Sequence, residues 1–530
     1  MGSENPNNLG YRYSHAHKRY KRADDDDGDG DGSGGKIPAN MVVKFQNREG
    51  EELSEAPLDV PTGSSVDDLS ALVHALQQQQ KAANGEDDDD NDGDKDRFVP
   101  YSFYAKLERN GVVDDVEITT STLADFLQQN QVSTEDVLEI LYQPLAVFKV
   151  RPVTRCTDTL PGHTEAILHV SYSPDGKQLA SGGGDFTVRF WDVYTSTPRK
   201  TCVGHKNHVL CTSWSPDGQR FASADKNGMV LLWNTKTHKP IGKPLRAHAP
   251  KYITAIAWEP LYQCATENCE RFATSSKDAT VRVWNARTQQ RIFTLSGHTD
   301  VVECVVWGEF LYSGSRDRTI KVWRPQDGKL IRTLQGHAHR INTLALSTDY
   351  TNRTGPYNHR GQLYDSDCSV VEAAKRKHRD ATGGEPEKLV SGSDDFTMFL
   401  WNPKESKHPL KRLVGHQQLV NHIAFSPDGR YLASASFDKK VKLWNGKSGE
   451  FLRTYTGHVG AVYRLAWSPD SRYLVSASKD STTKLWHVDQ KNAKATLPGH
   501  ADEVYALDWS PNGVSVATGS KDRTIKVWRH

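Results

Sequence analysis

The sequence predicts an all-β, eight-bladed β-propeller preceded by a small α+β domain. Eight times a Gly-His or Ala-His pair is followed by a Trp, most often 28 residues after the His. Six residues before each Trp stands an Asp or, in the second repeat, Asn227. A repeat of about 40 to 45 residues with this signature is typical of one propeller blade. The stretch before the first repeat lacks the signature, so we expect it to fold separately.

Charge divides the chain at the same place. The formal net charge of all 530 residues is +1, but residues 1–150 carry −16 and residues 151–530 carry +17. This asymmetry indicates different partners for the two parts. The seven cysteines are irregularly spaced, which favours a reducing compartment over a disulfide framework. No apolar run approaches the ~18 residues of a membrane span, so we expect no membrane association.

The N-terminal part is predicted to contain a tail and a domain. Residues 1–38 are expected to be a disordered charged tail, because they can bury too little apolar area to offset the ordering entropy. The basic residues 17–22 are either a nuclear-import signal or solvated charge. Residues 40–150 are expected to form the α+β domain, with an acidic loop at 84–96.

Periodicity and turn residues predict the helices and strands of this domain. Ser65 and Asp68 resemble a helix-capping pair, and apolar residues at helical spacing follow them. Residues 57–61 are expected to form an edge strand because they contain two prolines. The remaining predicted elements are strands at 41–45, 101–107, 112–118 and 138–150 and a short helix at 123–129. Strand, strand, helix and further strands is the order of a ubiquitin-like fold.

Residues 151–530 are predicted to form the propeller. In five repeats an apolar strand precedes a Ser-Pro-(Asp/Asn)-(Gly/Ser) turn, in which Pro sets φ and Gly tolerates positive φ. Repeats 3 and 5 have insertions instead, at 259–270 and 348–387. The longer insertion is polar and without periodicity, so we expect a mobile loop. We expect Val153–Leu160 to supply the outer strand of the last blade and so to close the ring.

Every repeat also has a Ser or Thr ten residues before its Trp. Ser, His and Asp together can form a nucleophilic triad. Their eightfold repetition instead indicates a structural network, in which Asp orients His, His bonds the hydroxyl and Trp completes the set. Blade 2 is expected to be the weakest because Asn227 carries no charge.

This signature resembles that of WD40 propellers, and all eight repeats carry it. In the WD40 family the Asp loop and the Gly-His loop open on the same top face, so the residues beside them are expected to be exposed there. Eleven of these are cations: Lys206, Lys226, Lys251, Lys277, Arg316, Arg318, Arg340, Lys439, Lys479, Lys521 and Arg523. Clustered cations of this kind are typical of contact with nucleic-acid phosphates or of a solvated surface.

Longer stretches resemble the Notchless family of ribosome-assembly factors, in which a ubiquitin-like (NLE) domain precedes a WD40 propeller. The stretches are residues 146–155, 345–350, 394–403, 419–422 and 425–429. The resemblance covers roughly residues 40–530. It implies that the N-terminal domain binds the MIDAS domain of midasin, an AAA ATPase, through one glutamate that completes the partner's divalent-metal shell.

The family motif for this contact matches Ser133-Thr134-Glu135-Asp136, so the resemblance assigns the metal-ligand role to Glu135 and partner contacts to Ser133, Thr134 and Asp136. Mg²⁺ requires near-octahedral oxygen geometry at about 2.0–2.1 Å. An Asp would fall short of that position by one C–C bond, about 1.5 Å. Without the resemblance, these residues indicate a turn or a helix cap.

The resemblance implies a non-enzymatic, monomeric assembly factor of the 60S subunit in the nucleus and nucleolus. The propeller is expected to anchor on rRNA and protein of the pre-60S particle, while residues 146–155 transmit ATP-driven force that releases assembly factors. No cofactor of its own and no small-molecule substrate are expected, and Mg²⁺ is shared with midasin. The alternatives are a WD40 substrate receptor in ubiquitin ligation, a Notch-type signalling scaffold and, ranked last, an enzyme.

Overall fold

The computed structural model describes residues 40–530 except 47–51, 54–55, 85–100, 110–111, 119–121, 131, 133–136, 145–149, 265 and 365–367. The chain forms two compact units, Met1–Pro144 and Leu145–His530. The predicted tail 1–38, nearly all of the acidic loop 84–96, the motif Ser133–Asp136 and residues 146–149 of the junction lie outside the described residues.

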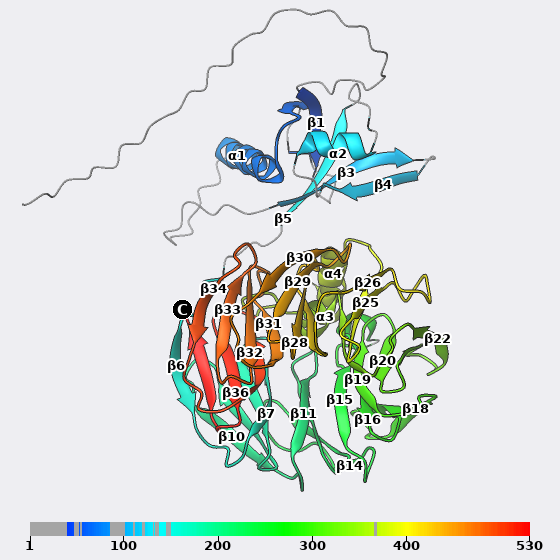
Figure 1. Cartoon of the computed structure of the whole chain (residues 1–530), viewed down its shortest axis with the longest axis vertical. Helices are drawn as coiled ribbons and strands as arrows, with labels where there is room; N and C mark the ends of the chain where they lie inside the picture. The colour runs from blue at the N-terminus through cyan, green and yellow to red at the C-terminus, as the bar shows by residue number, and fades with distance from the viewer. Residues whose placement is uncertain are drawn as a thin grey trace, which may run out of the picture. The chain divides into compact units, whose positions relative to one another are not determined.

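A five-stranded mixed sheet forms the N-terminal unit, in the order β2-β1-β5-β3-β4. Its elements are β1 (Asn40–Gln46), β2 (Leu58–Pro61), α1 (Val66–Asn84), β3 (Tyr101–Arg109), β4 (Val112–Glu117), α2 (Leu123–Asn130) and β5 (Leu138–Pro144). β1 and β5 are parallel neighbours, whereas the other pairs are antiparallel. β2 lies at an edge, as its prolines predict, and the strand order is that of a ubiquitin-like fold (Figure 1).

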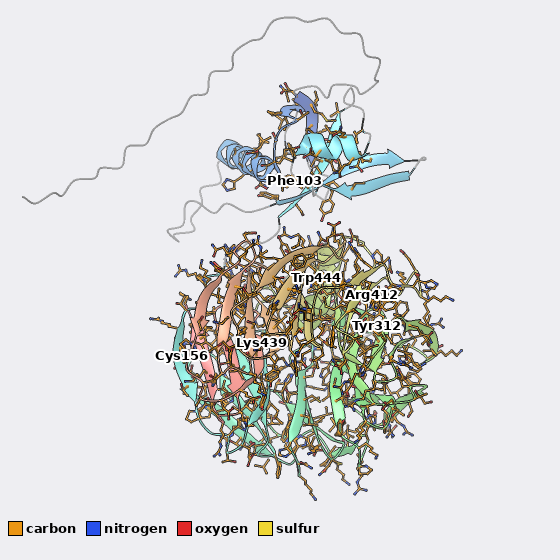
Figure 2. All side chains as sticks on the ribbon, viewed as in Figure 1. Phe103, Cys156, Tyr312, Arg412, Lys439 and Trp444 are labelled. Atoms are coloured by element: carbon orange, nitrogen blue, oxygen red, sulfur yellow. The ribbon has the colours of Figure 1, made fainter. Side chains whose placement is uncertain are left out.

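The helix α1 begins at the predicted cap. The backbone N–H of Asp68 donates to Ser65 Oγ at 3.2 Å, and Ser65 N–H donates back to the Asp68 carboxylate at 2.9 Å. Leu69 and Val73 on α1 are fully buried in one core with Phe103 of β3, which is labelled in Figure 2. The helical spacing in the sequence therefore marks the face that covers the sheet.

The C-terminal unit contains eight four-stranded sheets, the blades of the predicted propeller (Figure 1). Blades 1 to 4 consist of β7 (Ile167–Tyr172), β8 (Gln178–Gly183), β9 (Thr187–Asp192), β10 (Pro198–Val203); β11 (Val209–Trp214), β12 (Arg220–Asp225), β13 (Met229–Asn234), β14 (Leu245–Arg246); β15 (Ile253–Trp258), β16 (Arg271–Ser276), β17 (Thr280–Asn285), β18 (Arg291–Ser296); and β19 (Val302–Trp307), β20 (Leu311–Ser315), β21 (Thr319–Trp323), β22 (Leu330–Gln335).

Blades 5 to 8 follow the same pattern. They consist of β23 (Ile341–Leu346), β24 (Leu389–Ser393), β25 (Met398–Trp401), β26 (Lys411–Leu413); β27 (Val420–Phe425), β28 (Tyr431–Ser436), β29 (Val441–Asn445), β30 (Phe451–Tyr455); β31 (Val462–Trp467), β32 (Tyr473–Ser478), β33 (Thr483–His487), β34 (Ala493–Leu497); and β35 (Val504–Trp509), β36 (Val516–Ser520), β37 (Ile525–Arg529), β6 (Arg155–Leu160). The first strand of each blade is innermost. We call the face where innermost strands begin the upper face and the face where they end the lower face.

The ring closes as predicted. β6 pairs with β37, with Arg155 opposite Arg529 and Leu160 opposite Ile525. The expected strand 138–150, however, extends too far. β5 ends at Pro144, and Val150 N–H instead donates to the Asp470 carboxylate of blade 7 at 2.8 Å, so Val150 belongs to the propeller unit. The sequence does not show where the strand ends, because the apolar residues at both ends of the run, Leu138 and Val150, are buried in their own units.

The prediction of a mobile loop at 348–387 is wrong. This insertion contains α3 (Asp349–Thr354) and α4 (Val370–Thr382), and blade 3 contributes a short 3-10 helix, η1 (Leu261–Gln263). α4 begins at a capping box formed by Ser369 and Glu372 and ends at the left-handed Gly383. Its Ala374 packs in one cluster with Leu261, so the two insertions support each other. Small alanines and buried polar groups make these contacts, which explains why no apolar period is visible.

The same insertion crosses the lower face. Arg353 of α3 makes a bidentate pair with Asp508 of blade 8, at 2.7 and 2.8 Å. The Tyr357 hydroxyl donates to the Asp217 carbonyl of blade 2 at 3.2 Å. Lys377 of α4 is buried and donates to the Tyr357 carbonyl at 2.6 Å, and burial lowers its pKa to about 7. The insertion is therefore anchored to blades far from its own.

Candidate nucleic-acid interface

A four-residue network supports the loops of the upper face in every blade. The His Nε2 atom lies 2.7–2.8 Å from the Ser or Thr hydroxyl. The Trp Nε1–H donates to the same hydroxyl at 2.8–3.1 Å. The His Nδ1 atom lies 2.7–3.1 Å from an Asp carboxylate. Each His is buried by these partners, so the sets act as structural supports.

Blade 2 corrects one expectation. His205 Nδ1 contacts the carboxylate of Asp225 at 3.1 Å, so this blade has its charged member two residues before the expected position. Asn227 instead accepts a hydrogen bond from the Asn207 amide at 2.9 Å. The prediction that Asn227 makes blade 2 the weakest is therefore wrong in its premise. Alignment on the Trp could not reveal the substitution, because Asp225 stands where other blades have a small residue.

In seven of the eight blades the network lowers the pKa of its carboxylate. Burial alone would raise the pKa of Asp278, but the hydrogen bonds from His248 and Thr280 outweigh it and lower this pKa to about 2. The same balance lowers the pKa of Asp185, Asp317, Asp395, Asp438, Asp480 and Asp522. An ionised Asp accepts backbone and hydroxyl hydrogen bonds from the turn that follows it, so the turn is rigid.

These rigid turns expose the residue after the Asp. Arg318, Lys439 and Arg523 have φ of 70°, 69° and 71°, and Phe186 and Phe396 have φ of 64° and 68°. Such left-handed backbone is uncommon for bulky residues and persists only where the surroundings hold it. The exposed fraction is 40 % for Phe186 and 45 % for Phe396. The network therefore holds cations and aromatic rings in contact with solvent on the upper face.

The eleven predicted cations divide into two groups. Four are paired with acidic neighbours: Arg316 with Glu303, Arg340 with Asp394, Lys479 with Glu503 at 4.0 Å and Lys521 with Asp502 at 3.3 Å. The others are exposed, and among the described residues no acidic side chain lies within salt-bridge distance of them: Lys206, Lys226, Lys251, Lys277, Arg318, Lys439 and Arg523. Lys439 is labelled in Figure 2. Only the second group is available to an anionic ligand without breaking an ion pair.

Aromatic side chains accompany these cations, and the His-to-Trp repeat does not point to them. Phe437 lies beside Tyr463 with ring centroids 5.9 Å apart, and Tyr463 lies 5.6 Å from Tyr505. Tyr463 and Tyr505 are the second residues of β31 and β35, so they lie at the upper ends of innermost strands. Lys277 Nζ lies 5.3 Å from the centroid of the Tyr252 ring. Comparing the positions beside the repeated His and Asp would have revealed this aromatic series.

The structure leaves the metal-ligand prediction untested, because Ser133, Thr134, Glu135 and Asp136 lie outside the described residues. Within the described part of the chain, no group of three or more His, Cys, Asp or Glu side chains is placed to hold a metal ion. None of the described helices is both long and apolar enough to cross a membrane.

Comparisons with known proteins agree with both units. The NLE (NUC135) domain profile matches residues 41–127, and the WD domain, G-beta repeat profile matches 154–192, 196–234, 239–285 and 289–324. The IFT122 first beta-propeller profile matches 384–530. The crystal structure of the computationally designed Ika8 protein superposes with a TM-score of 0.55 and 26 % identity, covering 70 % of this chain and 98 % of that one.

Relatives of known name match more than two thirds of the chain. "Notchless protein homolog" of Arabidopsis thaliana is 53 % identical over 68 % of this chain and 74 % of its own length. The chain belongs to the Notchless family. Other Notchless-family relatives are "Protein Notchless" of Drosophila melanogaster, 43 % identical over 74 % of this chain and 75 % of its own, and "Ribosome assembly protein 4" of Saccharomyces cerevisiae, 42 % identical over 78 % and 80 %. The predicted resemblance and the WD40 propeller are thus confirmed.

Proposed function

We propose that this Notchless-family protein is a non-enzymatic assembly factor of the large ribosomal subunit, whose propeller binds pre-60S RNA and protein through its upper face. The observation that supports this most is the group of seven exposed, unpaired cations, interleaved with aromatic rings. Lys and Arg that neutralise phosphates release counterions, and aromatic rings stack on unpaired bases. The naming of a relative as "Ribosome assembly protein 4" supports the same assignment. Action on pre-60S particles places the protein in the nucleus and nucleolus.

The N-terminal unit supplies the second half of the proposal. Its ubiquitin-like domain would bind the MIDAS domain of midasin, with the Glu135 carboxylate filling the open position of the partner's Mg²⁺ and with Ser133, Thr134 and Asp136 beside it. A metal at a partner's surface needs one oxygen ligand at a fixed distance. An Asp side chain is shorter than a Glu side chain by one C–C bond, about 1.5 Å, so an Asp at position 135 would fall short of that distance.

Force from midasin then has a defined entry point in the propeller. Val150, the first described residue of the junction 146–155, is held by two hydrogen bonds: its N–H donates to Asp470 at 2.8 Å, and its carbonyl accepts from Arg472 at 3.1 Å. Val153 is fully buried, and the strand β6 that follows closes the ring. Pulling on this segment therefore loads blades 7 and 8 directly, so ATP-driven force would reach the particle and release assembly factors.

The proposed binding of midasin through Glu135 is tested with the full chain and a midasin MIDAS domain. In the presence of Mg²⁺ we expect capture by the wild type, loss of capture on chelation, and loss with both Glu135→Ala and Glu135→Asp. Glu139→Gln is the matched control, because Glu139 is 44 % exposed and pairs with Lys106 at 3.1 Å within the sheet. Capture of the Glu135 variants at the wild-type level, or capture that survives chelation, would show that the carboxylate is not a metal ligand.

A further inference from the structure

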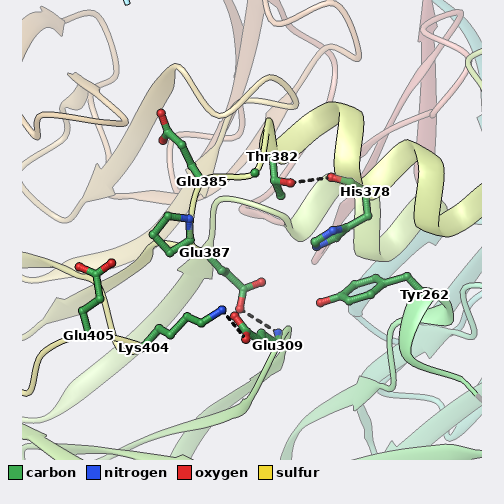
Figure 3. A pocket seen from close by; sticks show the side chains of 10 residues that line it. Tyr262, Glu309, His378, Thr382, Glu385, Glu387, Lys404 and Glu405 are labelled. Carbon is green, nitrogen blue, oxygen red and sulfur yellow. Dashed lines mark hydrogen bonds and ion pairs between the residues drawn. The ribbon is translucent and has the colours of Figure 1, made fainter. Parts of the chain in front are cut away.

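A cavity of about 460 Å³ opens on the lower side of the propeller, away from the cations of the upper face. Tyr262 comes from the blade 3 insertion, Glu309 from the β19–β20 turn and Lys404 with Glu405 from the β25–β26 loop. The end of α4 and the segment after it, 378–387, complete the wall (Figure 3). Two insertions that distinguish this propeller from a regular one therefore build the cavity.

Carboxylates dominate its lining. Glu309, Glu385, Glu387 and Glu405 line the cavity, and Lys404 is the only Lys or Arg among the lining residues. Glu385 is neutralised outside the cavity by Lys388 at 3.4 Å and Lys447 at 3.2 Å. Glu387 is buried and accepts hydrogen bonds from Glu309 N–H at 3.0 Å and the Tyr312 hydroxyl at 3.2 Å. Within the described residues Glu405 has no cation at salt-bridge distance, so the wall retains negative charge.

An aromatic pair forms the opposite side. The rings of Tyr262 and His378 lie in contact and are tilted, with centroids 3.8 Å apart and an interplanar angle of 33°. The His378 Nε2 atom is buried and has no hydrogen-bond partner in the structure. Burial lowers the pKa of His378, so the ring is neutral at physiological pH and does not offset the carboxylates. Aromatic rings beside carboxylates suit a planar cation, which can contact a ring and pair with a carboxylate at the same time.

The Lys404 side chain lies in the cavity and can be displaced by another cation. Its Nζ pairs with Glu309 at 2.9 Å, but its side chain is 54 % exposed, so this pair is weak. An incoming guanidinium could replace it, form two parallel hydrogen bonds with one carboxylate and stack on Tyr262, which an ammonium cannot do equally well. Phosphate groups would be repelled by the same carboxylates, so nucleic acid does not fit.

We propose that this lower-face cavity binds an arginine side chain of a basic protein segment. The site lies apart from the upper face, and its occupation does not depend on RNA binding there. Charge complementarity selects the occupant: the free carboxylate of Glu405 and the weakly held Glu309 face the cavity, while the aromatic pair excludes water from one side.

The test uses the purified full chain and two fluorescein-labelled peptides, one with three arginines separated by Gly-Ser pairs and one with citrulline at the same positions. At low salt we expect the arginine peptide to bind roughly tenfold more tightly than its neutral counterpart. Glu405→Gln, Glu309→Gln and Tyr262→Leu should each weaken the arginine peptide, whereas Lys404→Met should tighten it. Glu165→Gln removes an exposed upper-face carboxylate and should change nothing.

A photoreactive diazirine beside the central arginine separates this site from the acidic N-terminal part of the chain. We expect crosslinks to fragments that contain Tyr262 or residues 378–387. Equal binding of both peptides, unchanged binding by the three weakening variants together with Lys404→Met, or crosslinks confined to residues 1–144 would each overturn the proposal. Thermal melting of every variant verifies that it folds.

Discussion

The upper and lower faces of the propeller contain similar charged residues and use them in opposite ways. On the upper face seven of the eleven predicted cations have no acidic partner among the described residues. On the lower face three arginines pair with aspartates: Arg353 with Asp508 at 2.7 Å, Arg430 with Asp428 at 2.8 Å and Arg472 with Asp470 at 2.7 Å.

This difference shows that cation count alone does not identify a binding face. A paired arginine has its charge already neutralised. Its removal lowers the free energy of unfolding, because the partner carboxylate is left without a counter-charge. An exposed, unpaired lysine contributes little to stability and remains available to a ligand. We therefore expect substitutions on the lower face to affect stability and equivalent substitutions on the upper face to affect binding.

The largest effect is expected from Arg353→Met. The substitution leaves the buried Asp508 carboxylate, whose pKa burial already raises, without its bidentate partner. Because the Arg353 side chain is 40 % exposed, we expect a cost of about 2–4 kcal/mol, below the about 3–5 kcal/mol typical of a fully buried pair. Denaturant unfolding of the propeller measures the cost, and Arg318→Met on the upper face is the control, expected to stay within about 0.5 kcal/mol of wild type. Equal effects of the two variants would remove the distinction between the faces.

A smaller effect is expected within blade 2. Asp225→Ala removes the partner of His205 and should cost about 1–3 kcal/mol, because a buried ring nitrogen loses its hydrogen bond. Asn227→Ala breaks only a contact with Asn207 and should cost well under about 1 kcal/mol. The same unfolding measurement compares them. The reverse order would restore the original expectation that position 227 limits this blade.

Blade 2 also illustrates what the sequence can and cannot predict. The spacing of His, Ser or Thr, Asp and Trp predicts all eight blades, because each blade needs the same buried polar network. The position of Asp225 was missed because a carboxylate can reach the same His from a neighbouring backbone position. The sequence shows which cations stand beside the repeated His and Asp, but it does not show which of them are paired, because Glu303 and Asp394 approach from other parts of the chain.

The insertion 348–387 was missed for a different reason. Its order comes from contacts with blades 2, 3 and 8, such as Arg353 with Asp508, which are distant in the sequence. Local periodicity reveals an element that packs one apolar face on a core. The insertion 348–387 instead packs on polar turns, so it shows no such period. The capping box of Ser369 and Glu372 marks the start of α4 in the structure, but no helix was predicted from it.

The smallest effect is a pH dependence confined to this insertion. Burial raises the pKa of Asp349 and Glu387 to about 7, above their ordinary 3.8 and 4.5, so their stability contribution is lost as pH rises toward 7. The pKa of Lys377 is lowered to about 7 from 10.5, so stability is regained as pH rises above 7. Local stability should therefore be lowest near pH 7.

Hydrogen exchange of the α4 amides, corrected for intrinsic rates, measures this minimum. Glu387→Gln should reduce the loss of local stability as the pH rises toward 7. Lys377→Met should reduce the gain of local stability above pH 7. A profile that changes in one direction throughout, with the turns of the upper face responding in the same way, would contradict the assigned cause.

The central claim, that unpaired upper-face cations bind RNA, is tested most directly by the salt dependence of RNA affinity. The full chain is titrated with a 30-nucleotide single-stranded RNA at several salt concentrations. Replacing Lys226, Lys277, Arg318 and Lys439 by Gln should lower the slope of log K against log salt by about 3, since each phosphate contact contributes about 0.7. Replacing the paired Arg316, Arg340, Lys479 and Lys521 by Gln should leave the slope nearly unchanged. Equal loss of slope in both variants, or none in either, would contradict the account.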